Sequence, residues 1–581
     1  MRRLLPLLLG LVALPLVAAS PLADHPSPYL ALHADDPVQW QLWDKALLAQ
    51  AQREDKLIFV SSGYFACHWC HVMQRESYQN DEIAALLNRH FLSVKIDREL
   101  RPDIDARLFE FVEQELGVAG WPLNVFLSPY GEPISGLVYQ PPQLFARTLR
   151  RVVEQWQEKG DKPGTEEPGT GVSTAQASQL VSEPGVLRDQ LEQALLAALE
   201  QQGDFFSGGF GEGGKFPRVP LLTLMLEHYR DHPVAEGLLR LTLEQMHTQG
   251  LRDHLGGGFF RYTVDPQWRE PHFEKMLYDN AQLAWLYLRA AQLLDEPAYR
   301  RVGEQTLDFM LRDMWHPRGG LSGSISALDG EGRDGGYYLW TREALTGLLS
   351  EEELALLRDV WEMEGAPVFE HGYLPRASTQ DDERLRAVHQ RLLRERQQRR
   401  APLDSKRLAG WNALALRALS LGAEKARRYR VAGAAIDRYL KSLWDGEQLW
   451  MMRDDGGALR QHATLEDYAL VAGGLYAWHR ASGDSASREL AATLLKAAAS
   501  EFYRTGRWRL GSGGETGLLE RHYAVRPAGA LPSPVAELLK LQRSLGLALL
   551  PEEQLLHAAP GELLASPLDY PGYLALLVGW P

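Results

Sequence analysis

Two cysteines placed three residues apart are the feature of this chain with the most specific chemistry. Cys67 and Cys70 are the only two cysteines in 581 residues, and they lie in the string Cys67-His68-Trp69-Cys70-His71. A pair with this spacing can cycle between dithiol and disulfide, bind a metal or, with the histidine that follows, accept a covalently attached haem. The loop between the two cysteines is too short to staple a fold of this size, which favours a redox or ligand role.

The residues around the pair favour the redox alternative. Residues 57–60 form a continuous apolar run, typical of a buried strand, and a helical pattern follows the cysteines. Unsatisfied N–H groups at a helix start stabilise a thiolate, and a protonated His68 adds to that effect. We therefore expect Cys67 to be the attacking thiol and Cys70, one turn further on, to resolve the mixed disulfide. For His71, the alternative to a functional role is that it only packs against its neighbours.

A second element of a redox site is the string Gly120-Trp121-Pro122. A proline in a turn directly before a strand suits a cis peptide bond. In thioredoxin folds such a proline packs beside the disulfide and helps to present a substrate strand. We expect Pro122, together with His68 and Trp69, to support the cysteine pair.

The elements that must position these residues change character along the chain. Residues 24–157 alternate helix and strand patterns, which predicts a central sheet covered by helices. The expected elements are an amphipathic helix over 38–52, strands over 57–60, 91–96 and 122–127, and a helix over 103–116. Residues 158–185 are rich in Gly, Pro, Thr, Ser and Glu, which is typical of a linker.

Residues 186–581 are almost all helical in pattern. Six glycine-led segments recur there at separations of roughly 50–75 residues, enough for two helices and a turn. This repeat predicts six helical hairpins that close into an (α/α)6 toroid. An irregular helical bundle is the alternative.

The toroid has its own candidate residues for a cavity. His272, Lys275 and Asp279 have the spacing of one helix face. Their alternative is a Lys275–Asp279 helix pair beside a satisfied core histidine. A glycosidase needs two carboxylates at a set separation, and an epimerase needs paired acid and base groups. The residues expected to line the cavity are His254, Arg261, Tyr262, His272, Lys275, Asp279 and Asp467.

The N-terminus has the pattern of a secretory signal over residues 1–19. Arg2 and Arg3 precede an apolar run over 4–17, and small residues follow it. We expect an exported protein, periplasmic or secreted, with no membrane association after cleavage; an uncleaved anchor is the alternative. The net charge of -14 argues against a nucleic-acid partner.

Longer strings of residues resemble one known family along nearly the whole mature chain. The matching strings include Ser27-Pro28-Tyr29-Leu30, Cys67 to Met73, Lys95 to Glu99, Gly120 to Leu123, Gly256 to Phe259, Pro271 to Asn280, Trp411-Asn412 and Asp467 to Ala469. They resemble the spermatogenesis-associated protein 20 family of thioredoxin-like proteins. The resemblance implies a multidomain chain: an N-terminal α/β thioredoxin-like domain, then an all-α (α/α)6 toroid related to six-hairpin glycosidases and N-acylglucosamine 2-epimerase.

Three departures from the family pattern weaken any sugar chemistry in the toroid. An acidic stretch is reduced to Ile325 to Asp329, a late polar stretch to Leu531 to Pro534, and the segment around 365–380 is short. The cysteine pair is unaffected by these losses.

The function expected from the sequence is that of an exported thiol–disulfide oxidoreductase, whose toroid binds a substrate or partner. Protein thiols or disulfides, or another redox protein, are the expected partners, with no metal and no cofactor. The alternatives are a carbohydrate-active or carbohydrate-binding toroid with a structural thioredoxin domain, and a non-catalytic interaction scaffold. Two converging carboxylates in a polar pocket would favour sugar chemistry, and an exposed Cys67 beside a plugged toroid would favour redox.

Overall fold

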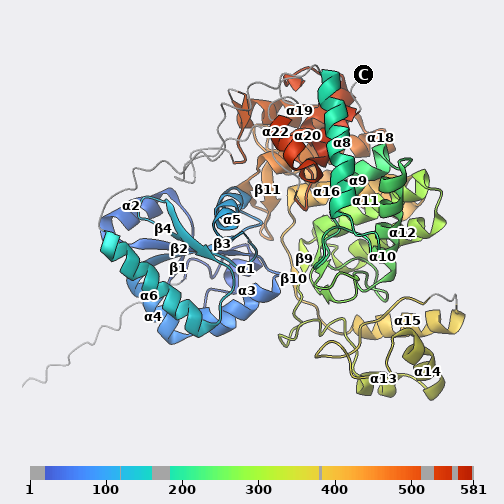
Figure 1. Ribbon diagram of the computed structural model, residues 1–581, viewed down its shortest axis with the longest axis horizontal. Coiled ribbons are helices and arrows are strands. Elements are labelled where there is room, and N and C mark those ends of the chain that lie inside the picture. The colour runs from blue at the N-terminus through green and yellow to red at the C-terminus, as the bar shows by residue number, and fades with distance from the viewer. Residues whose placement is uncertain are drawn as a thin grey trace, which may run out of the picture.

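The computed structural model describes residues 20–117, 119–159, 184–378, 382–504, 506–511, 529–552 and 560–578. The predicted signal segment and most of the predicted linker lie outside these residues. A domain built around a sheet occupies one side of the molecule, and helices form the other (Figure 1). None of the helices in the described residues is long and apolar enough to span a membrane.

The N-terminal domain is built on a five-stranded sheet in the order β1-β3-β2-β4-β5. Strands β1 and β2 both run parallel to β3, whereas β4 is antiparallel to β2 and to β5. The strands are β1 (Trp40–Gln41), β2 (Leu57–Gly63), β3 (Phe91–Asp97), β4 (Leu123–Leu127) and β5 (Pro133–Leu137). This order and the mixed directions are those of a thioredoxin-like domain.

Helices cover both faces of this sheet because the buried strands are apolar on both sides. Ile58 and Val60 of β2 pack in one cluster with side chains of α2 and α5, whereas Phe59 packs towards α6 on the other face. The helices are α1 (Pro28–Ala31), α2 (Lys45–Glu54), α3 (His68–Met73), the π-helix η1 (Gln74–Tyr78), α4 (Asp81–His90), α5 (Pro102–Leu116) and α6 (Pro142–Lys159).

The helix expected over residues 38–52 begins later than the sequence predicted. Trp40 and Gln41 form β1, which pairs with Ser93 and Val94 of β3. The Asp44 carboxylate caps the true helix start by accepting a hydrogen bond from the Leu47 N–H at 2.9 Å. The apolar spacing before Asp44 therefore belongs to an edge strand and not to the helix.

The C-terminal part closes into a ring. Among the described residues, six helices pack each against the next, and the last closes onto the first. They are α9 (Val219–His228), α11 (Leu277–Leu293), α16 (Ala409–Ala423), α18 (Leu465–Ser482), α20 (Pro534–Leu545) and α23 (Pro571–Val578). The outer helices are α8 (Pro184–Gln202), α10 (Pro233–Thr248), α12 (Pro297–Asp313), α17 (Arg427–Lys441), α19 (Ser485–Phe502) and α22 (Pro560–Ala565). The ring is the expected (α/α)6 toroid.

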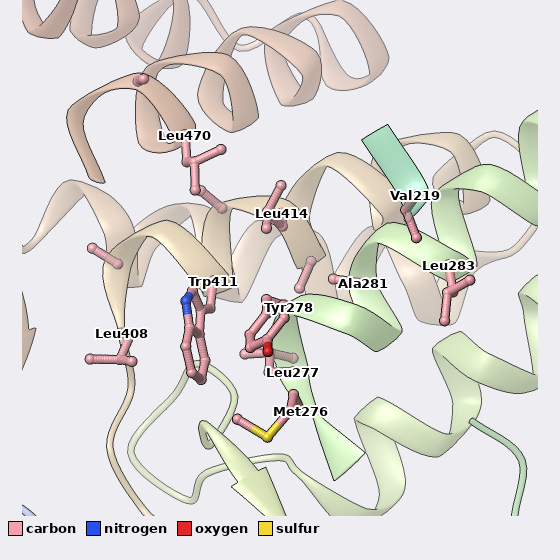
Figure 2. Close-up of a cluster of buried hydrophobic side chains, with 14 of the residues drawn as sticks. Val219, Met276, Leu277, Tyr278, Ala281, Leu283, Leu408, Trp411, Leu414 and Leu470 are labelled. Atoms are coloured by element: carbon pink, nitrogen blue, oxygen red, sulfur yellow. The ribbon is translucent and has the colours of Figure 1, made fainter. Parts of the chain in front are cut away.

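Apolar and aromatic side chains fill the ring between the inner helices (Figure 2). The rings of Tyr278 on α11 and Trp411 on α16 meet edge to face at 4.8 Å. One turn further along the same helices, Ala281 and Leu414 line a small cavity of about 250 Å³.

Short strands and one small lobe complete the helical part. The lobe consists of α13 (Arg342–Leu348), α14 (Glu351–Val360) and α15 (Glu383–Arg396), and it has its own apolar cluster around Trp340 and Trp361. The strands are β6 (Tyr262–Thr263), β7 (Pro271–His272), β8 (Lys275–Met276), β9 (Ser324–Ile325), β10 (Leu403–Asp404), β11 (Trp450–Arg453), β12 (Leu459–His462), β13 (Tyr503–Arg504) and β14 (Arg507–Trp508).

The expected helix face of His272, Lys275 and Asp279 does not exist. His272 lies in β7, Lys275 lies in β8, and α11 begins only at Leu277. Lys275 pairs with Ile325 of β9, so strand pairing holds this segment extended. The spacing of three and four residues was a coincidence of two strands followed by a helix.

Candidate active site at the domain junction

The cysteine pair lies at the start of α3, directly after β2. Cys67 and Cys70 form a disulfide with 5.3 Å between their Cα atoms. Cys67 has extended backbone angles and caps the helix, because its sulfur accepts a hydrogen bond from the Cys70 N–H at 3.1 Å. This position stabilises a thiolate at Cys67 once the disulfide is reduced.

The other supporting residues surround the pair. The Trp121–Pro122 peptide bond is cis, and it lies in the loop before β4. The Trp121 ring donates a hydrogen bond to the Asp105 carboxylate at 3.0 Å, and the Arg98 guanidinium lies 3.8 Å from the centre of that ring. Trp69, between the cysteines, is 41% exposed and packs against Tyr139.

The toroid holds the loop that carries Cys67. The Tyr64 hydroxyl donates to the Glu274 carboxylate at 2.7 Å, and the Ala327 N–H donates to the Ala66 carbonyl at 3.4 Å. On the other side of the cysteine, His68 Nδ1 lies 3.4 Å from Asp334. Contacts therefore hold the backbone on both sides of Cys67. Cys67 is 2% exposed and Cys70 is 1% exposed, so the exposed Cys67 that would have favoured a redox role is not found, and Cys67 faces the cavity described below instead.

A second contact between the domains is fully buried. Lys406 of the toroid forms ion pairs with Asp97, the last residue of β3, and with Glu99, which follows that strand, at 2.9 Å in the case of Glu99. It also pairs with its neighbour Asp404 at 3.2 Å. The Ser27 hydroxyl donates a further hydrogen bond to Asp97 at 2.5 Å. Burial raises the pKa of Glu99 to about 8 and raises that of Asp404, whereas the surrounding carboxylates raise the pKa of Lys406 in spite of burial.

A cavity of about 780 Å³ lies between the two domains, and Cys67 lies on its wall. Tyr64, Trp69 and Trp121 line it from the thioredoxin-like domain, and Tyr278 and Trp411 line it from the toroid. The cavity therefore joins the cysteine pair, the loop with the cis proline and the mouth of the ring.

The charged residues of this cavity are predominantly acidic. Among the described lining residues, seven are acidic and two are arginines. The thioredoxin-like domain provides Glu99, Asp105, Glu110, Glu113 and Arg98, and the toroid provides Glu274, Glu466, Asp467 and Arg261. Arg98 pairs with Asp105 at 3.3 Å, and Arg261 pairs with Glu274 at 3.0 Å.

Burial disfavours the charged form of several carboxyl groups here. It raises the pKa of Glu274 and of Asp467. It also raises the pKa of Asp279 to about 7, and the Oδ2 atom of Asp279 has no hydrogen-bond partner among the described residues. These three carboxyl groups are therefore shifted towards their neutral form.

The seven toroid residues proposed from the sequence fall into three groups. Arg261, Tyr262 and Asp467 line the cavity. His272 stacks on Tyr262 with ring centres 4.5 Å apart, and the Arg261 charge lowers the pKa of Asp279. Both residues are therefore neighbours of lining residues without lining the cavity themselves.

His254 and Lys275 lie elsewhere and have partners there. The His254 Nε2 atom is 2.9 Å from the Gln249 carbonyl, and burial lowers the His254 pKa to about 3. Lys275 pairs with Asp253 at 2.7 Å, and Arg396 binds the same carboxylate at 2.7 Å. This network anchors the glycine loop and the C-terminal end of α15. The Lys275–Asp279 pair, which was the alternative, is also absent, because Lys275 pairs with Asp253 instead.

Several site residues were missed by the sequence analysis. Tyr64 follows the glycine that ends β2, Glu274 lies within the longest matching string, and Arg98 and Glu99 follow β3. The positions of Tyr64, Arg98 and Glu99 after the adjacent strands β2 and β3 were a usable signal, because such strand ends meet at one edge of a sheet. Lys406 gave no such signal.

The histidines near the pair do not form a metal cluster. Among the described residues, no group of three or more His, Cys, Asp and Glu side chains is arranged to hold a metal ion. His71 Nε2 lies 2.8 Å from the Phe65 carbonyl, and burial lowers the His71 pKa. His71 thus has the packing role that was its alternative.

Known proteins are similar to this chain in both its thioredoxin-like domain and its toroid. The family model Thioredox_DsbH, described as "Protein of unknown function, DUF255", matches residues 19–167. Spermatogenesis-associated protein 20 of Homo sapiens is 34% identical over 541 residues, which are 81% of this chain and 68% of that protein. The Rattus norvegicus protein of the same name is 32% identical over 83% of this chain and 69% of its own length.

Solved structures resemble each part separately. A D-mannose isomerase covers 67% of this chain and 84% of its own at 12% identity and a TM-score of 0.40. A DsbH oxidoreductase covers 20% of this chain and 86% of its own at 18% identity and a TM-score of 0.18. With its thioredoxin-like domain, its toroid and its identity to the human protein over more than two thirds of both chains, this chain belongs to the spermatogenesis-associated protein 20 family.

Proposed function

We propose that the protein is a thiol–disulfide oxidoreductase whose active site is the cavity shared by the two domains. The observation that carries the proposal is the place of Cys67: it caps α3 and lies on the wall of that cavity, together with Trp121 of the cis-proline loop. The toroid has the role of the second wall, which binds and orients the substrate.

The reaction is a two-step exchange. The Cys67 thiolate attacks one sulfur of a substrate disulfide, forms a mixed disulfide and releases the first substrate thiolate, which takes up a proton. The Cys70 thiolate then attacks the Cys67 sulfur and releases the second thiolate, so that the substrate gains two electrons and the protein regains its disulfide. In the reverse direction the same steps oxidise a dithiol, or two thiols.

The proposal is tested by trapping the intermediate in the full chain. We expect Cys70→Ser to accumulate a mixed disulfide through Cys67, because the resolving thiol is absent. Cys67→Ser should accumulate little, because Cys67 lines the cavity and Cys70 does not. Mass spectrometry under non-reducing conditions identifies the linked cysteine; trapping only through Cys70, or no exchange by the native chain, rules the proposal out.

The proposal includes export, on the pattern of residues 1–19 alone. Arg2 and Arg3, followed by a short apolar run and small residues, are typical of a cleaved signal. An oxidising compartment would keep the pair as the disulfide. Cell fractionation with N-terminal sequencing tests this, and a full-length chain retained in the cytoplasm contradicts it.

A carbohydrate function of the toroid is the second candidate. It is favoured by the carboxyl groups of Glu274 and Asp467 and the aromatic rings of Tyr262 and Trp411, which line one cavity. Aromatic rings and paired carboxyl groups are the groups that sugar sites use. The test is conversion or binding of mono- and disaccharides by the Cys67→Ser chain, in which redox chemistry is absent. Binding that Trp411→Ala abolishes would support this candidate.

A further inference from the structure

The two cysteines differ in what can stabilise their thiolates. The Cys70 N–H donates to the Cys67 sulfur at 3.1 Å, so the start of α3 stabilises a thiolate at Cys67. Cys70 lies within the first turn of that helix, is 1% exposed and is not among the described residues that line the cavity. A buried thiolate without a donor is costly, yet the second step of the exchange requires one at Cys70. The donor for it has to come from another element.

Tyr29 on α1 carries a buried hydroxyl that can be this donor. The residue is 1% exposed, and its hydroxyl has no hydrogen-bond partner among the described residues. Such a group costs free energy, because it has given up its hydrogen bonds with water. An unpartnered hydroxyl beside a redox pair points to a partner that is present in the other redox state.

Gly63, the last residue of β2, keeps the hydroxyl close to the Cys70 sulfur. A Cβ atom added to Gly63 would lie 2.3 Å from the Tyr29 hydroxyl oxygen and 2.8 Å from the Cys70 sulfur. Both atoms therefore border one small gap, and they are closer to each other than the sum of these two distances. A larger residue than glycine would fill the gap and push the phenol or the sulfur away.

Contacts on several sides fix the Tyr29 ring. The Ser27 hydroxyl, which caps α1, donates a hydrogen bond to Asp97 at 2.5 Å and so ties the helix to the end of β3. The ring of His33 meets the Tyr29 ring edge to face at 5.1 Å, and the Lys95 ammonium lies 5.2 Å from its centre. On reduction the S–S bond no longer holds the Cys70 sulfur. The sulfur is therefore the atom that can turn towards the hydroxyl.

We propose that the Tyr29 hydroxyl donates a hydrogen bond to the Cys70 sulfur in the reduced protein and thereby favours the thiolate that resolves the mixed disulfide. This inference rests on the proposed function and assigns a residue to its second step. A disulfide sulfur is a weak acceptor, which accounts for the unpartnered hydroxyl of the oxidised chain, whereas a thiolate is a strong one. Burial raises the pKa of Tyr29, so the phenol keeps its proton and remains a donor.

The resolving step is balanced without a proton from Tyr29. The mixed disulfide joins Cys67 to the substrate sulfur, and Cys70 begins as a thiol. Cys70 loses its proton, its sulfur bonds to the Cys67 sulfur, and the bond between Cys67 and the substrate breaks. The substrate leaves as a thiolate and takes up one proton, so the number of protons is unchanged. Tyr29 lowers the free energy of the charged sulfur and keeps its own O–H bond throughout.

The test is Tyr29→Phe, which removes the hydroxyl and keeps the ring. The full chain is reduced, freed of reductant and mixed in a stopped-flow instrument with a smaller amount of dithiodipyridine, both halves of which leave as a coloured thione. Release of the first thione reports attack by Cys67, and its rate depends on the protein concentration. Release of the second reports resolution by Cys70, and its rate does not.

We expect resolution in Tyr29→Phe to slow about threefold to tenfold at pH 7, and its pH midpoint to rise by about one to two units, because the thiolate loses a hydrogen bond. A less acidic thiol is a better nucleophile, so the rate falls less than the thiolate fraction does. The deficit should shrink as the pH rises and both chains become ionised at Cys70, while attack by Cys67 stays unchanged.

The possible results separate this inference from the proposed function. An unchanged second phase, or slowing by the same factor at every pH, overturns the role of Tyr29 and leaves the exchange reaction standing. Equal slowing of both phases also overturns it, because the hydroxyl would then act through packing. If the native chain releases no thione in either phase, the proposed function itself fails.

The charged groups around Tyr29 and Cys70 need their own control. Burial lowers the pKa of Lys95 to about 7, within the range of the experiment. The midpoint shift caused by Tyr29→Phe should persist when both chains also carry Lys95→Met. A shift that disappears there belongs to Lys95 and overturns the inference. The other titratable groups near the phenol or on α3 are the same in the two chains compared: His33, Asp36, Tyr78, Asp97, Asp105, His68 and His71.

A matched variant tests whether the Tyr29 hydroxyl has a purely structural role. The hydroxyl of Tyr229, at the C-terminal end of α9, is also buried without a partner among the described residues, so Tyr229→Phe is the control. Neither variant should lower the denaturant midpoint of the oxidised chain, since neither hydroxyl has a hydrogen bond to lose. Only Tyr29→Phe should slow resolution. A lower midpoint for oxidised Tyr29→Phe, or equal slowing in the two variants, would contradict the proposal.

Discussion

The two domains meet at the Lys406 ion pairs and at the cavity, and acidic side chains have a different environment in each place. At the Lys406 contact, three carboxylates surround one lysine that is fully buried, and the space is filled by protein. At the cavity, seven acidic residues face two arginines across a space of about 780 Å³. Glu99 belongs to both, since it pairs with Lys406 and also lines the cavity.

The Lys406 contact therefore has a structural role, whereas the cavity leaves room for a ligand. Removing a buried lysine that meets three acidic side chains is strongly destabilising, because it leaves their charges buried without a cation. The cavity adds little to stability, but it leaves a place for a ligand. The predictions below test this division, from the largest expected effect to the smallest.

Lys406→Met should give the largest effect. It leaves Asp97, Glu99 and Asp404 buried without their cation, so the free energy of unfolding should fall by about 3–5 kcal/mol. Denaturant unfolding of the full chain measures this change. Lys496→Met on α19, where the side chain is exposed, is the control and should change little. A loss below about 1 kcal/mol would contradict the structural role of Lys406.

The fold was largely predictable from the sequence, because its elements have strong local signals. The apolar run at 57–60 and the cysteine pair place β2 and α3, and the glycine-led repeats predict six hairpins. The edge strand β1 was missed because Trp40 and Gln41 fit the apolar spacing of the helix that follows. Trp40 and Gln41 form a strand and not a helix because they pair with β3, whose residues are about fifty positions away in the sequence.

The site was less predictable in the toroid than in the thioredoxin-like domain. Cys67, Trp69 and the cis Pro122 are recognisable from short strings, because the chemistry and the turn lie within a few residues. Arg261 and Asp467 line the cavity, but Lys275 is drawn away by Asp253 and Arg396. Partners more than a hundred residues apart, such as Asp253 and Arg396, leave no local pattern.

Glu99→Gln tests the pH dependence of the shared residue. Burial raises the Glu99 pKa to about 8, so the folded chain binds this proton more tightly than the unfolded chain. The stability contributed by that proton is present below the unfolded pKa and is lost as the pH rises through the folded value. Native stability should therefore fall between about pH 5 and pH 8, by at most about 1.4 kcal/mol per pH unit for one proton.

In Glu99→Gln this part of the slope should disappear, since glutamine does not titrate. The variant should gain stability relative to the native chain as the pH rises across that window. Denaturant unfolding of both chains at pH 5, 6, 7 and 8 measures the difference. Parallel curves would show that Glu99 is already ionised throughout and fully compensated by Lys406.

Tyr64→Phe should give the smallest effect and the most local one. It removes the hydroxyl that donates to Glu274 and also accepts a hydrogen bond from Arg261, while the ring can still pack against Trp121. Loss of this bond should lower the free energy of unfolding by about 1 kcal/mol. The Arg261–Glu274 ion pair remains, so Glu274 is not left without a partner.

The same variant tests whether the contact with Glu274 restricts access to Cys67. If it does, amide hydrogen exchange across residues 64–68 should accelerate in Tyr64→Phe, and Cys67 should react faster with a disulfide on a folded protein. Tyr130→Phe is the control, because Tyr130 is 52% exposed and lies in the turn before β5. Since the Lys406 contact is untouched, global stability should change far less than in Lys406→Met. Faster exchange at residues 64–68 with an unchanged Cys67 rate would mean that the cavity, and not the clamped loop, selects the substrate.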